Sequence, residues 1–253
     1  MKMIELSAED LLKKYFENFN SCIVALSGGA DSATVANLVC GYLDRDHIYS
    51  ATCVDKHIFR DEIENARQIA DLLGIKWIPF HAAIPGEFYN NEDVNKRCYI
   101  CKKGIFTALN RIKVIMGIDI IFDGTNVDDL KEKRPGFLAL KEINVKSPLL
   151  DNNLGKDFVY KRIRVFEEKG IVFRDESCIA TRIMEGKITV EKMALVERVE
   201  GSLRGIYHGI RIKIYNNYIK VFFKNSYLLT DKDKLMIRNT MQKYVQGTPV
   251  IFS

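Results

Sequence analysis

Apolar residues along the first 170 positions fall into two alternating kinds of run. Short, partly β-branched runs predict buried parallel strands, and longer runs with an apolar residue every three or four positions predict amphipathic helices. The strands are expected at 22–26, 48–54, 76–80 and 119–122. The helices are expected at 7–19, 33–42, 60–73, 101–116 and 157–169. This alternation predicts right-handed βαβ units, and therefore an α/β fold with a Rossmann-like parallel sheet.

The pattern changes near residue 180. A helix is expected at 189–199, and two strands of period two at 210–215 and 218–223 flank Asn216-Asn217, a hairpin turn signal. A second helix at 235–244 and a short strand at 248–252 complete a small α+β domain. We therefore expect two domains, 1–180 and 181–253, the second of which binds substrate and supports oligomerisation.

A glycine-rich turn, Ser27-Gly28-Gly29-x-Asp31-Ser32, follows the first expected strand. The two glycines let the backbone approach a phosphate, and the N–H groups and dipole of the next helix attract an anion. Both serines add hydroxyl donors. The Asp31 carboxylate would repel a phosphate unless a cation such as Mg²⁺ bridges them. No Gly-Lys-Ser/Thr follows, so the turn is not a Walker A loop. It resembles the pyrophosphatase loop (PP-loop) of ATP-consuming adenylating enzymes; the alternative is a tight strand-to-helix turn with a serine cap.

Other residues at the carboxyl ends of expected strands fit the same ligand. Asp55 lies where a doubly wound sheet contacts adenine or ribose, and Gly124-Thr125 would lie beside the first loop. The sequence therefore predicts an ATP site formed by Ser27, Gly28, Gly29, Asp31, Ser32, Asp55, Gly124 and Thr125.

The six cysteines divide into two groups. Three lie in expected strands or helices, where small buried thiols are usual. Cys98, Cys101 and Cys178 lie in polar surroundings and need another explanation. A structural zinc would lack a fourth ligand, a redox dithiol would leave Cys178 without a role, and the three thiols could be unrelated. A 4Fe–4S cluster held by three cysteines leaves one iron open, and we favour it in a chain that also has an adenylating loop.

The net charge of +5 is unevenly distributed. Residues 182–253 carry 13 Lys or Arg against 6 Asp or Glu, whereas the preceding residues carry 25 against 27. The basic excess suits a phosphorylated substrate or nucleic acid, although a solvated basic face is equally compatible. No run is long and apolar enough for a membrane span and 1–10 lacks a signal-peptide plan, so we expect a cytoplasmic protein without membrane partners.

Several blocks together resemble the LarE family of ATP-dependent sulfur transferases. They are Ser27-Gly28-Gly29-x-Asp31-Ser32, Asp123-Gly124-Thr125-Asn126-x-Asp128-Asp129, Arg134-Pro135-Gly136, Ser147-Pro148-Leu149 and Ser177-Cys178-Ile179-Ala180-Thr181-Arg182. The resemblance implies an adenine nucleotide alpha hydrolase-like sheet followed by a small α+β domain, often assembled as a homo-oligomer. The chain departs from the family's pattern at Lys133 and at Met184-Glu185-Gly186.

That family thiolates a pyridinium dicarboxylate mononucleotide on the way to a nickel-pincer cofactor. One branch gives up the sulfur of a cysteine at the place of Cys178. Another branch has the extra Cys-x-x-Cys, here Cys98 and Cys101, and looks suited to bind a 4Fe–4S cluster with a labile sulfide. This chain has the second pattern. The resemblance implies catalytic roles for these three cysteines and Asp31, with ATP, Mg²⁺ and the cluster as cofactors and an unidentified sulfide source.

The expected reaction adenylates a substrate carboxylate and replaces the AMP with sulfur. Arg134, Arg182, Arg211 and Lys213 are candidate contacts for the substrate phosphate, because guanidinium and ammonium groups pair with phosphate. Arg211 and Lys213 alternate along one expected strand and so share a face, which is equally compatible with solvated charges.

Two alternatives remain. A tRNA thiolase with the same loop would also use three cysteines and a basic domain, although the aromatic–basic tract typical of RNA binding is not evident. A non-catalytic ATP- or zinc-binding module would bind its ligand without turnover.

Overall fold

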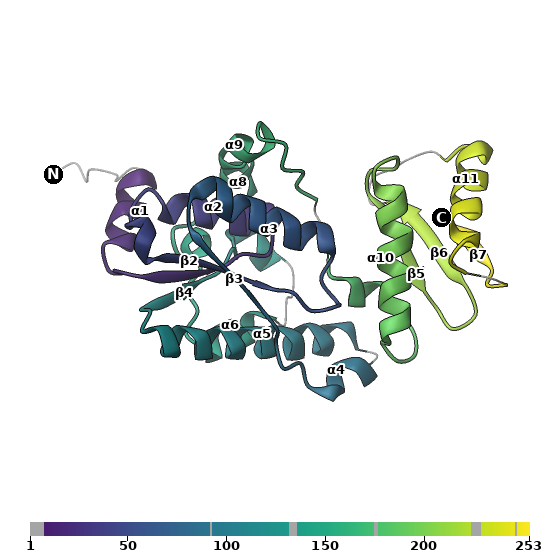
Figure 1. Cartoon of the computed structure of the whole chain (residues 1–253), viewed down its shortest axis with the longest axis horizontal. Helices are drawn as coiled ribbons and strands as arrows, with labels where there is room; N and C mark the ends of the chain where they lie inside the picture. The colour runs from purple at the N-terminus through teal and green to yellow at the C-terminus, as the bar shows by residue number, and fades with distance from the viewer. Residues whose placement is uncertain (1–7, 92, 132–135, 175–176, 224–228, 246) are drawn as a thin grey trace. The chain divides into compact units, whose positions relative to one another are not determined.

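The computed structural model describes residues 8–91, 93–131, 136–174, 177–223, 229–245 and 247–253 (Figure 1). The chain divides into two compact units. The first unit comprises Met1–Asp55, Arg60–Pro85 and Cys98–Asp175. The second comprises Lys56–Phe59, Gly86–Arg97 and Glu176–Ser253. Each unit is described by itself.

The first unit is built on a four-stranded parallel sheet in the order β3-β2-β1-β4. Its strands are β1 (Cys22–Ala25), β2 (Ile48–Cys53), β3 (Lys76–Phe80) and β4 (Ile120–Phe122). β1 is central, with Cys22 opposite Ile48 on one side and Ile120 on the other. Residues on both faces of β1 are buried, which explains its continuous apolar run. The predicted α/β fold with a Rossmann-like sheet is confirmed.

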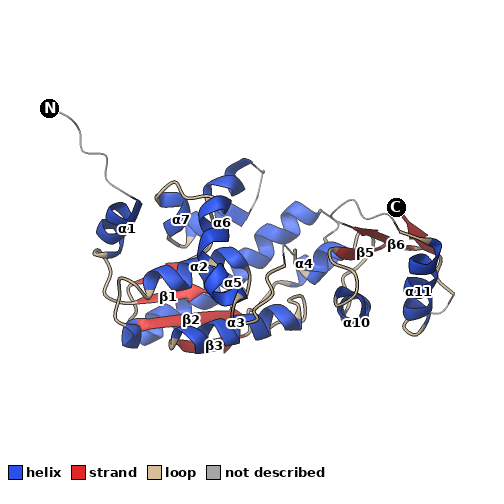
Figure 2. Ribbon diagram, turned by 90° about the horizontal axis from the view of Figure 1, so that it is seen from above, coloured by secondary structure: helices blue, strands red, loops and turns tan. Residues whose placement is uncertain are grey.

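Helices cover both faces of this sheet (Figures 1 and 2). α2 and α3 lie on one face, and the part of α5 after Cys98 lies on the other. The largest core cluster joins the sheet to the first face and includes Val24, Leu38, Ile69 and Phe122. The helices of this unit are α1 (Ala8–Phe16), α2 (Ala30–Val39), α3 (Arg60–Leu73), α5 (Val94–Met116, from Cys98 onward), α6 (Gly136–Glu142), α7 (Pro148–Asp151), α8 (Lys156–Arg162) and α9 (Arg164–Glu167), with the 3₁₀ turns η1 (Arg45–His47) and η2 (Val127–Lys131).

The strand order defines where a ligand binds. The chain builds β1, β2 and β3 outward in one direction and then returns to place β4 on the other side of β1. The carboxyl ends of β1 and β4 therefore flank a topological switch point, where open α/β sheets bind their ligands. Gly124, after β4, packs so closely on the loop after β1 that an added Cβ would lie 2.6 Å from the Ser32 nitrogen.

The second unit holds a three-stranded mixed sheet, in which β5 (Ile210–Ile214) and β6 (Ile219–Phe223) form the expected hairpin. β7 (Val250–Phe252) adds in parallel to β6. α10 (Val190–Arg204) and α11 (Asp231–Gln242) accompany the sheet, and α4 (Gly86–Asn90) and η3 (Ile179–Arg182) complete the unit (Figure 1). Val199, Ile212 and Ile237 are fully buried and belong to its apolar core.

Some element boundaries differ from the expected ones. The helix expected to begin at Cys101 begins at Val94, because Asp93 accepts hydrogen bonds from the backbone N–H groups of Asn95 (2.8 Å) and Lys96 (3.3 Å). Cys98 and Cys101 consequently both lie inside α5. The helix expected at 157–169 is interrupted between α8 and α9, where Ile163 takes the 3₁₀-like angles φ −76° and ψ −13°. α11 begins at Asp231 because Thr230 and Asp233 form a capping box.

Among the described residues, no helix combines the length and the apolar character needed to cross a membrane.

Candidate functional site: a phosphate loop and three cysteines

The loop after β1 is folded by its own hydroxyl groups. The Ser27 and Ser32 hydroxyl oxygens lie 3.0 Å apart, and Ser32 Oγ also donates to the Gly29 carbonyl oxygen (3.1 Å). Gly28 adopts φ +85°, and an added Cβ would lie 2.0 Å from the Glu62 carbonyl oxygen, so this position requires glycine. The sequence of the loop therefore determines a compact turn made largely of backbone.

The N-terminus of α2 carries no side-chain cap. Gly29 is the N-cap residue and no side chain caps the first turn, so the serine cap of the alternative interpretation is wrong, although the turn itself is tight. The first-turn N–H groups and the positive end of the helix dipole form an anion-binding position. This arrangement is the geometry expected of a loop that holds a phosphate.

Asp31, in the first turn of α2, is paired with Lys156. The Lys156 ammonium nitrogen lies 2.8 and 2.6 Å from the two Asp31 carboxylate oxygens. Lys156 is the first residue of α8, and its backbone N–H donates to Asp128 Oδ2 (2.7 Å). Sequence reasoning missed Lys156; its signal was a Gly-Lys pair directly before an expected helix.

The same carboxylate fits a magnesium ion. The Asp31 side chain is 27% exposed, and carboxylate oxygens are hard ligands that Mg²⁺ prefers. A metal ion at Asp31 would compete with the Lys156 ammonium and leave that cation within reach of a bound phosphate.

The loop after β4 contains a buried carboxyl group. Asp123 accepts hydrogen bonds from Ser147 Oγ and Thr125 Oγ1, each at 2.5 Å. Burial raises the pKa of Asp123 above its ordinary value, and the positive charge of Lys102 acts in the opposite direction. Thr125, expected to contact ATP, therefore donates its hydroxyl to Asp123.

Lys102, on α5, interacts electrostatically with Asp123 of this loop, within the first unit. It lies on α5 directly after Cys101, and an added Cβ at Gly136 would lie 2.5 Å from Lys102 Cδ. Cys98 and Lys102 are four residues apart, so they share a face of α5. Cys101 is buried and Cys98 half-buried. The helix face that carries Cys98 is therefore turned toward the loop after β4, and sequence reasoning missed the residue that indicates it.

Asp55, the predicted adenine or ribose contact, lies at the end of β2. Its Oδ1 is 2.7 Å from His81 Nδ1, and its Oδ2 accepts from the Ala82 N–H (3.0 Å). The Cys53 thiol lies 3.2 Å from the same carboxylate, and burial, the largest cause, raises the pKa of Cys53 to about 12. The contact of Asp55 with a nucleotide stays a prediction.

Cys178 and Arg182 lie in the second unit. Cys178 is half-buried and is the N-cap residue of η3. Arg182, predicted to contact phosphate, is 2% exposed and pairs through Nε with Glu200 Oε1 (2.8 Å). Arg97, which directly precedes Cys98 in the chain, donates to the carbonyl oxygens of Ala180 (3.2 Å) and Ile183 (3.0 Å). The phosphate role of Arg182 stays a prediction, and its observed contacts are internal.

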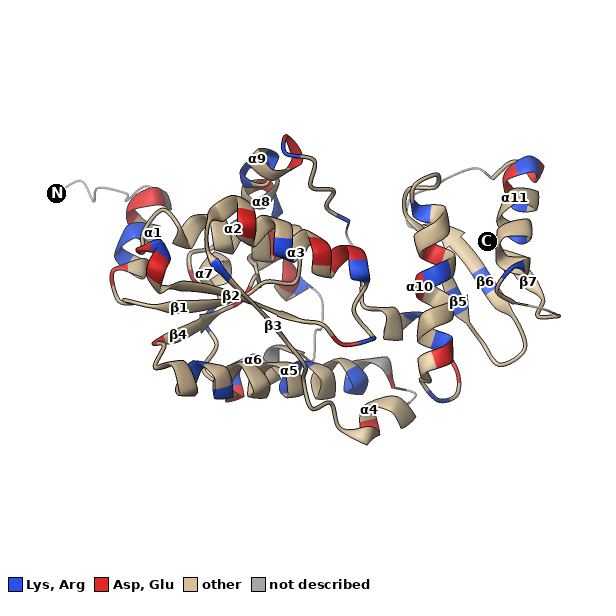
Figure 3. Ribbon diagram, in the orientation of Figure 1, with Lys and Arg blue, Asp and Glu red and all other residues tan. Residues whose placement is uncertain are grey.

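Basic residues lie along the strands of the β5–β6 hairpin (Figure 3), and on β5 they share the face opposite the buried isoleucines. Arg211 and Lys213 alternate with buried isoleucines on β5, as their spacing predicted. Lys220 on β6, which sequence reasoning missed, is the register partner of Lys213. Like charges directly opposite each other weaken a sheet, so this face is suited to an anion. Arg134, the fourth predicted phosphate contact, lies outside the described residues.

The three cysteines are distributed between the units. Cys98 and Cys101 belong to the first unit, one helical turn apart on α5, and Cys178 belongs to the second. Within the described ranges, no group of three His, Cys, Asp or Glu side chains has an arrangement that could hold a metal ion. The donor chemistry of three thiols, two of them on adjacent turns, fits ligands of an iron–sulfur cluster.

Comparisons with known proteins agree with the fold and the loop. Residues 3–118 match the NAD synthase family. An uncharacterized protein of Methanocaldococcus jannaschii is 30% identical over 93% of this chain and 90% of its own length. A second, from Synechocystis, is 30% identical over 87% of this chain and 82% of its own length. The pyridinium-3,5-bisthiocarboxylic acid mononucleotide synthase of Lactiplantibacillus plantarum is 26% identical over 78% of this chain and 72% of its own length.

These matches cover the loop, the sheet and most of the second unit. The chain therefore belongs to the PP-loop ATP pyrophosphatase family, whose members use ATP. The synthase of L. plantarum is a distant homologue within this group.

Proposed function

We propose that the chain is an ATP-dependent sulfur transferase that adenylates a substrate carboxylate and replaces the AMP with sulfur. The observation that carries the proposal lies in the first unit, where Lys102, four residues after Cys98 on α5, lies against Gly136 and acts electrostatically on Asp123 in the loop after β4. Sulfur transfer to an adenylated carbon requires thiols within reach of an adenylating loop, and this contact supports such an arrangement. The distant homologue named for a bisthiocarboxylic acid product supports the same chemistry.

The proposed reaction has two steps. A carboxylate oxygen of the substrate attacks the α-phosphorus of ATP, and pyrophosphate leaves. A sulfur nucleophile then attacks the activated carbonyl carbon, and AMP leaves with the electron pair of the broken carbon–oxygen bond. The first step turns a poor leaving group into a good one.

The residues of the phosphate loop serve the first step. The N–H groups at the start of α2 bind phosphate oxygens, and Asp31 would hold magnesium, which offsets the charge of the pyrophosphate when bound. Lys156, the observed partner of Asp31, would bind the pyrophosphate when Asp31 holds the metal. Gly124 keeps the loop after β4 close enough to complete the cradle.

The cysteines serve the second step. We propose that Cys98, Cys101 and Cys178 hold a 4Fe–4S cluster, which when bound would supply an open iron able to carry an exchangeable sulfide. The hydrogen bonds from Arg97 support this assignment, because the residue before Cys98 holds the backbone after Cys178. If the cluster is absent, the Cys178 thiolate displaces AMP and forms a thioester. Loss of the Cys178 α-proton with cleavage of its Cβ–Sγ bond then releases a thiocarboxylate and leaves dehydroalanine, so each chain turns over once.

The basic face of the hairpin receives the substrate. Arg211, Lys213 and Lys220 present the guanidinium and ammonium groups that pair with a phosphate, and a pyridinium dicarboxylate mononucleotide carries both a phosphate and the reacting carboxylates.

The test is the iron and acid-labile sulfide content of protein purified without oxygen. The wild type is expected to hold about four irons and at least four sulfides per chain. Cys98→Ala, Cys101→Ala and Cys178→Ala are each expected to lose them. Cys40→Ala, at the C-cap of α2, is the matched control and should retain them. Zinc, or no metal, in the wild type would contradict the cluster and leave Cys178 as a consumed sulfur donor.

A tRNA thiolase is the second candidate. The half-buried Tyr215 and Tyr218 rings stack with their centroids 4.4 Å apart at the hairpin, and aromatic rings can stack on bases. Salt-sensitive tRNA binding that Lys213→Ala weakens would favour this candidate, and its absence would remove it.

A further inference from the structure

A buried network of charges lies in the second unit beneath the segment that carries Cys178. Arg182, Glu200 and Arg204 are 2%, 0% and 4% exposed. Arg182 Nε and Arg204 Nη2 donate to different Glu200 oxygens, at 2.8 and 2.9 Å. The backbone N–H of Ile212 on β5 also donates to Glu200 Oε1 (3.0 Å). A buried carboxylate is tolerated when its oxygens are satisfied in this way.

The two guanidinium groups rest on an aromatic ring. Phe59, which is 1% exposed, lies 3.7 Å from Arg204 Cζ and 5.6 Å from Arg182 Cζ, measured to the ring centroid. This contact and the Glu200 carboxylate fix the plane of the Arg182 guanidinium.

The Nη1 group of the Arg182 guanidinium contacts residues on either side of Cys178. Arg182 Nη1 donates to Ser177 Oγ (2.6 Å) and to Thr181 Oγ1 (3.1 Å). Thr181 Oγ1 in turn donates to the Cys178 carbonyl oxygen (2.7 Å). A chain of hydrogen bonds therefore runs from Glu200 through Arg182 to the backbone of Cys178.

A second anchor holds the same segment. The Ile179 N–H donates to the carbonyl oxygen of His57 (2.9 Å), and Arg97 donates to the carbonyl oxygens of Ala180 and Ile183. The residues around Cys178 thus depend on buried charged groups for their conformation, because η3 is four residues long and its N-cap has no side-chain cap hydrogen bond.

We infer that Glu200 is a positioning residue for Cys178: it orients Arg182, which fixes Ser177 and Thr181 and thereby the backbone that presents the thiol. The inference rests on the proposed function, in which Cys178 takes part in sulfur transfer. Glu200 contacts neither nucleotide nor sulfur in this account and acts through Arg182.

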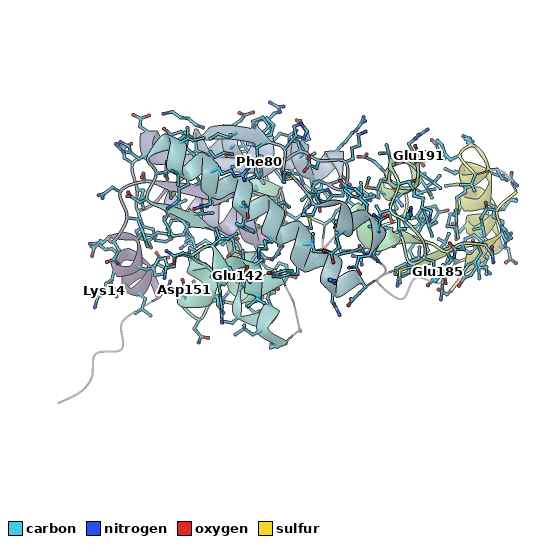
Figure 4. All side chains as sticks on the ribbon, turned by 90° about the horizontal axis from the view of Figure 1, so that it is seen from below. Lys14, Phe80, Glu142, Asp151, Glu185 and Glu191 are labelled. Atoms are coloured by element: carbon cyan, nitrogen blue, oxygen red, sulfur yellow. The ribbon has the colours of Figure 1, made fainter. Side chains whose placement is uncertain are left out.

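The experiment compares Glu200→Gln and Ser177→Ala with the wild type by amide hydrogen exchange and by sulfur-transfer kinetics. Glu191→Gln is the matched control, because it makes the same change at an exposed position on the first turn of α10 (Figure 4). Ser177 is exposed, so its variant tests the outer end of the chain of hydrogen bonds without disturbing the core.

Both variants are expected to exchange the amides of 178–183 about tenfold faster, because each removes a hydrogen bond with a charged partner from the segment. The kcat of sulfur transfer should fall in both variants, while their KM for ATP stays at the wild-type value. The control variant should match the wild type in exchange rates, kcat and KM. In the double variant, the amide exchange rates at 178–183 should be little faster than in Glu200→Gln alone, because both changes act through Arg182.

Unchanged exchange at 178–183 in a folded Ser177→Ala variant would overturn the inference. Faster exchange in Glu200→Gln spread evenly over α10 and the β5–β6 hairpin, with kcat unchanged, would also overturn it, since the network would then have a purely structural role. Locally faster exchange in a protein whose wild type transfers no sulfur would instead uphold the positioning and refute the proposed function.

Discussion

The phosphate loop and the Cys178 segment are held in place by opposite means. The loop after β1 is formed by glycines, two hydroxyls and the backbone of α2. Its charged residue Asp31 and the ion-pair partner of Asp31, Lys156 on α8, are partly exposed. The Cys178 segment is held by charged side chains that are almost fully buried, Arg182 and Glu200 among them. Because backbone groups hold the loop in shape, its charged side chains can change partners when a ligand binds. A buried network of ion pairs instead fixes one conformation.

This difference predicts which changes affect binding and which affect presentation of the thiol. Substitutions in the phosphate loop should act on ATP, and substitutions beneath Cys178 should act on sulfur transfer.

The largest effect is expected at Asp31. Asp31→Asn removes the carboxylate that would hold magnesium, and the rate of pyrophosphate release should fall about a thousandfold. Asp71→Asn, an exposed carboxylate on α3, is the control and should retain the wild-type rate. A coupled assay for pyrophosphate measures both, and a fall of less than about threefold in Asp31→Asn would contradict the assignment.

A smaller effect is expected from Gly124→Ala. The added Cβ would meet the backbone at Ser32 (2.6 Å) and Asp31 (2.8 Å), so the loops after β1 and β4 must separate. The Kd for ATP should rise about tenfold, equivalent to about 1.4 kcal/mol. Calorimetric titration checks this against Gly201→Ala on α10, where an added Cβ meets nothing within 4 Å and no change is expected.

Lys156→Met should weaken ATP binding by a comparable or smaller factor. The ammonium that pairs with Asp31 is also the cation that binds the pyrophosphate in the proposed function, so its loss should raise the Kd for ATP about fivefold. Lys131→Met, which removes an exposed partner of Asp128, is the control. Equal affinities for Lys156→Met and the wild type would show that Lys156 serves Asp31 alone.

The smallest effect concerns pH. Lys131 and the backbone N–H of Lys156 donate to Asp128 and lower the pKa of its carboxyl group. A lowered pKa in the folded state gives a stabilisation that is complete above the ordinary carboxyl pKa of about 3.9 and is lost as the pH falls through the lowered value. The Tm difference between wild type and Asp128→Asn should therefore shrink below about pH 4. A difference that is constant from pH 6 to pH 2 would contradict this.

The fold could be predicted because its signals are local. The apolar runs of β1 to β4 and the period-two alternation around Ile212 follow directly from the chain, and α3 and β3 have the expected bounds. The glycine-rich turn was recognisable because backbone geometry requires glycine at Gly28.

The side-chain networks could not be predicted because their partners lie far apart in the sequence. Lys156 is 125 residues from Asp31, and Arg182, predicted to contact a substrate phosphate, is paired with the buried Glu200. The start of α5 was missed because Asp93 caps a run of polar residues that reads as a loop.

The most direct test of the account separates its two steps in one variant. Wild type and Cys178→Ala, purified without oxygen, are incubated with ATP, magnesium and a pyridinium dicarboxylate mononucleotide, and both AMP formation and sulfur incorporation are measured by mass spectrometry. The account predicts that Cys178→Ala still adenylates the carboxylate and releases pyrophosphate but incorporates no sulfur. Sulfur incorporation by Cys178→Ala at the wild-type rate, or a wild type that never forms AMP, would contradict it.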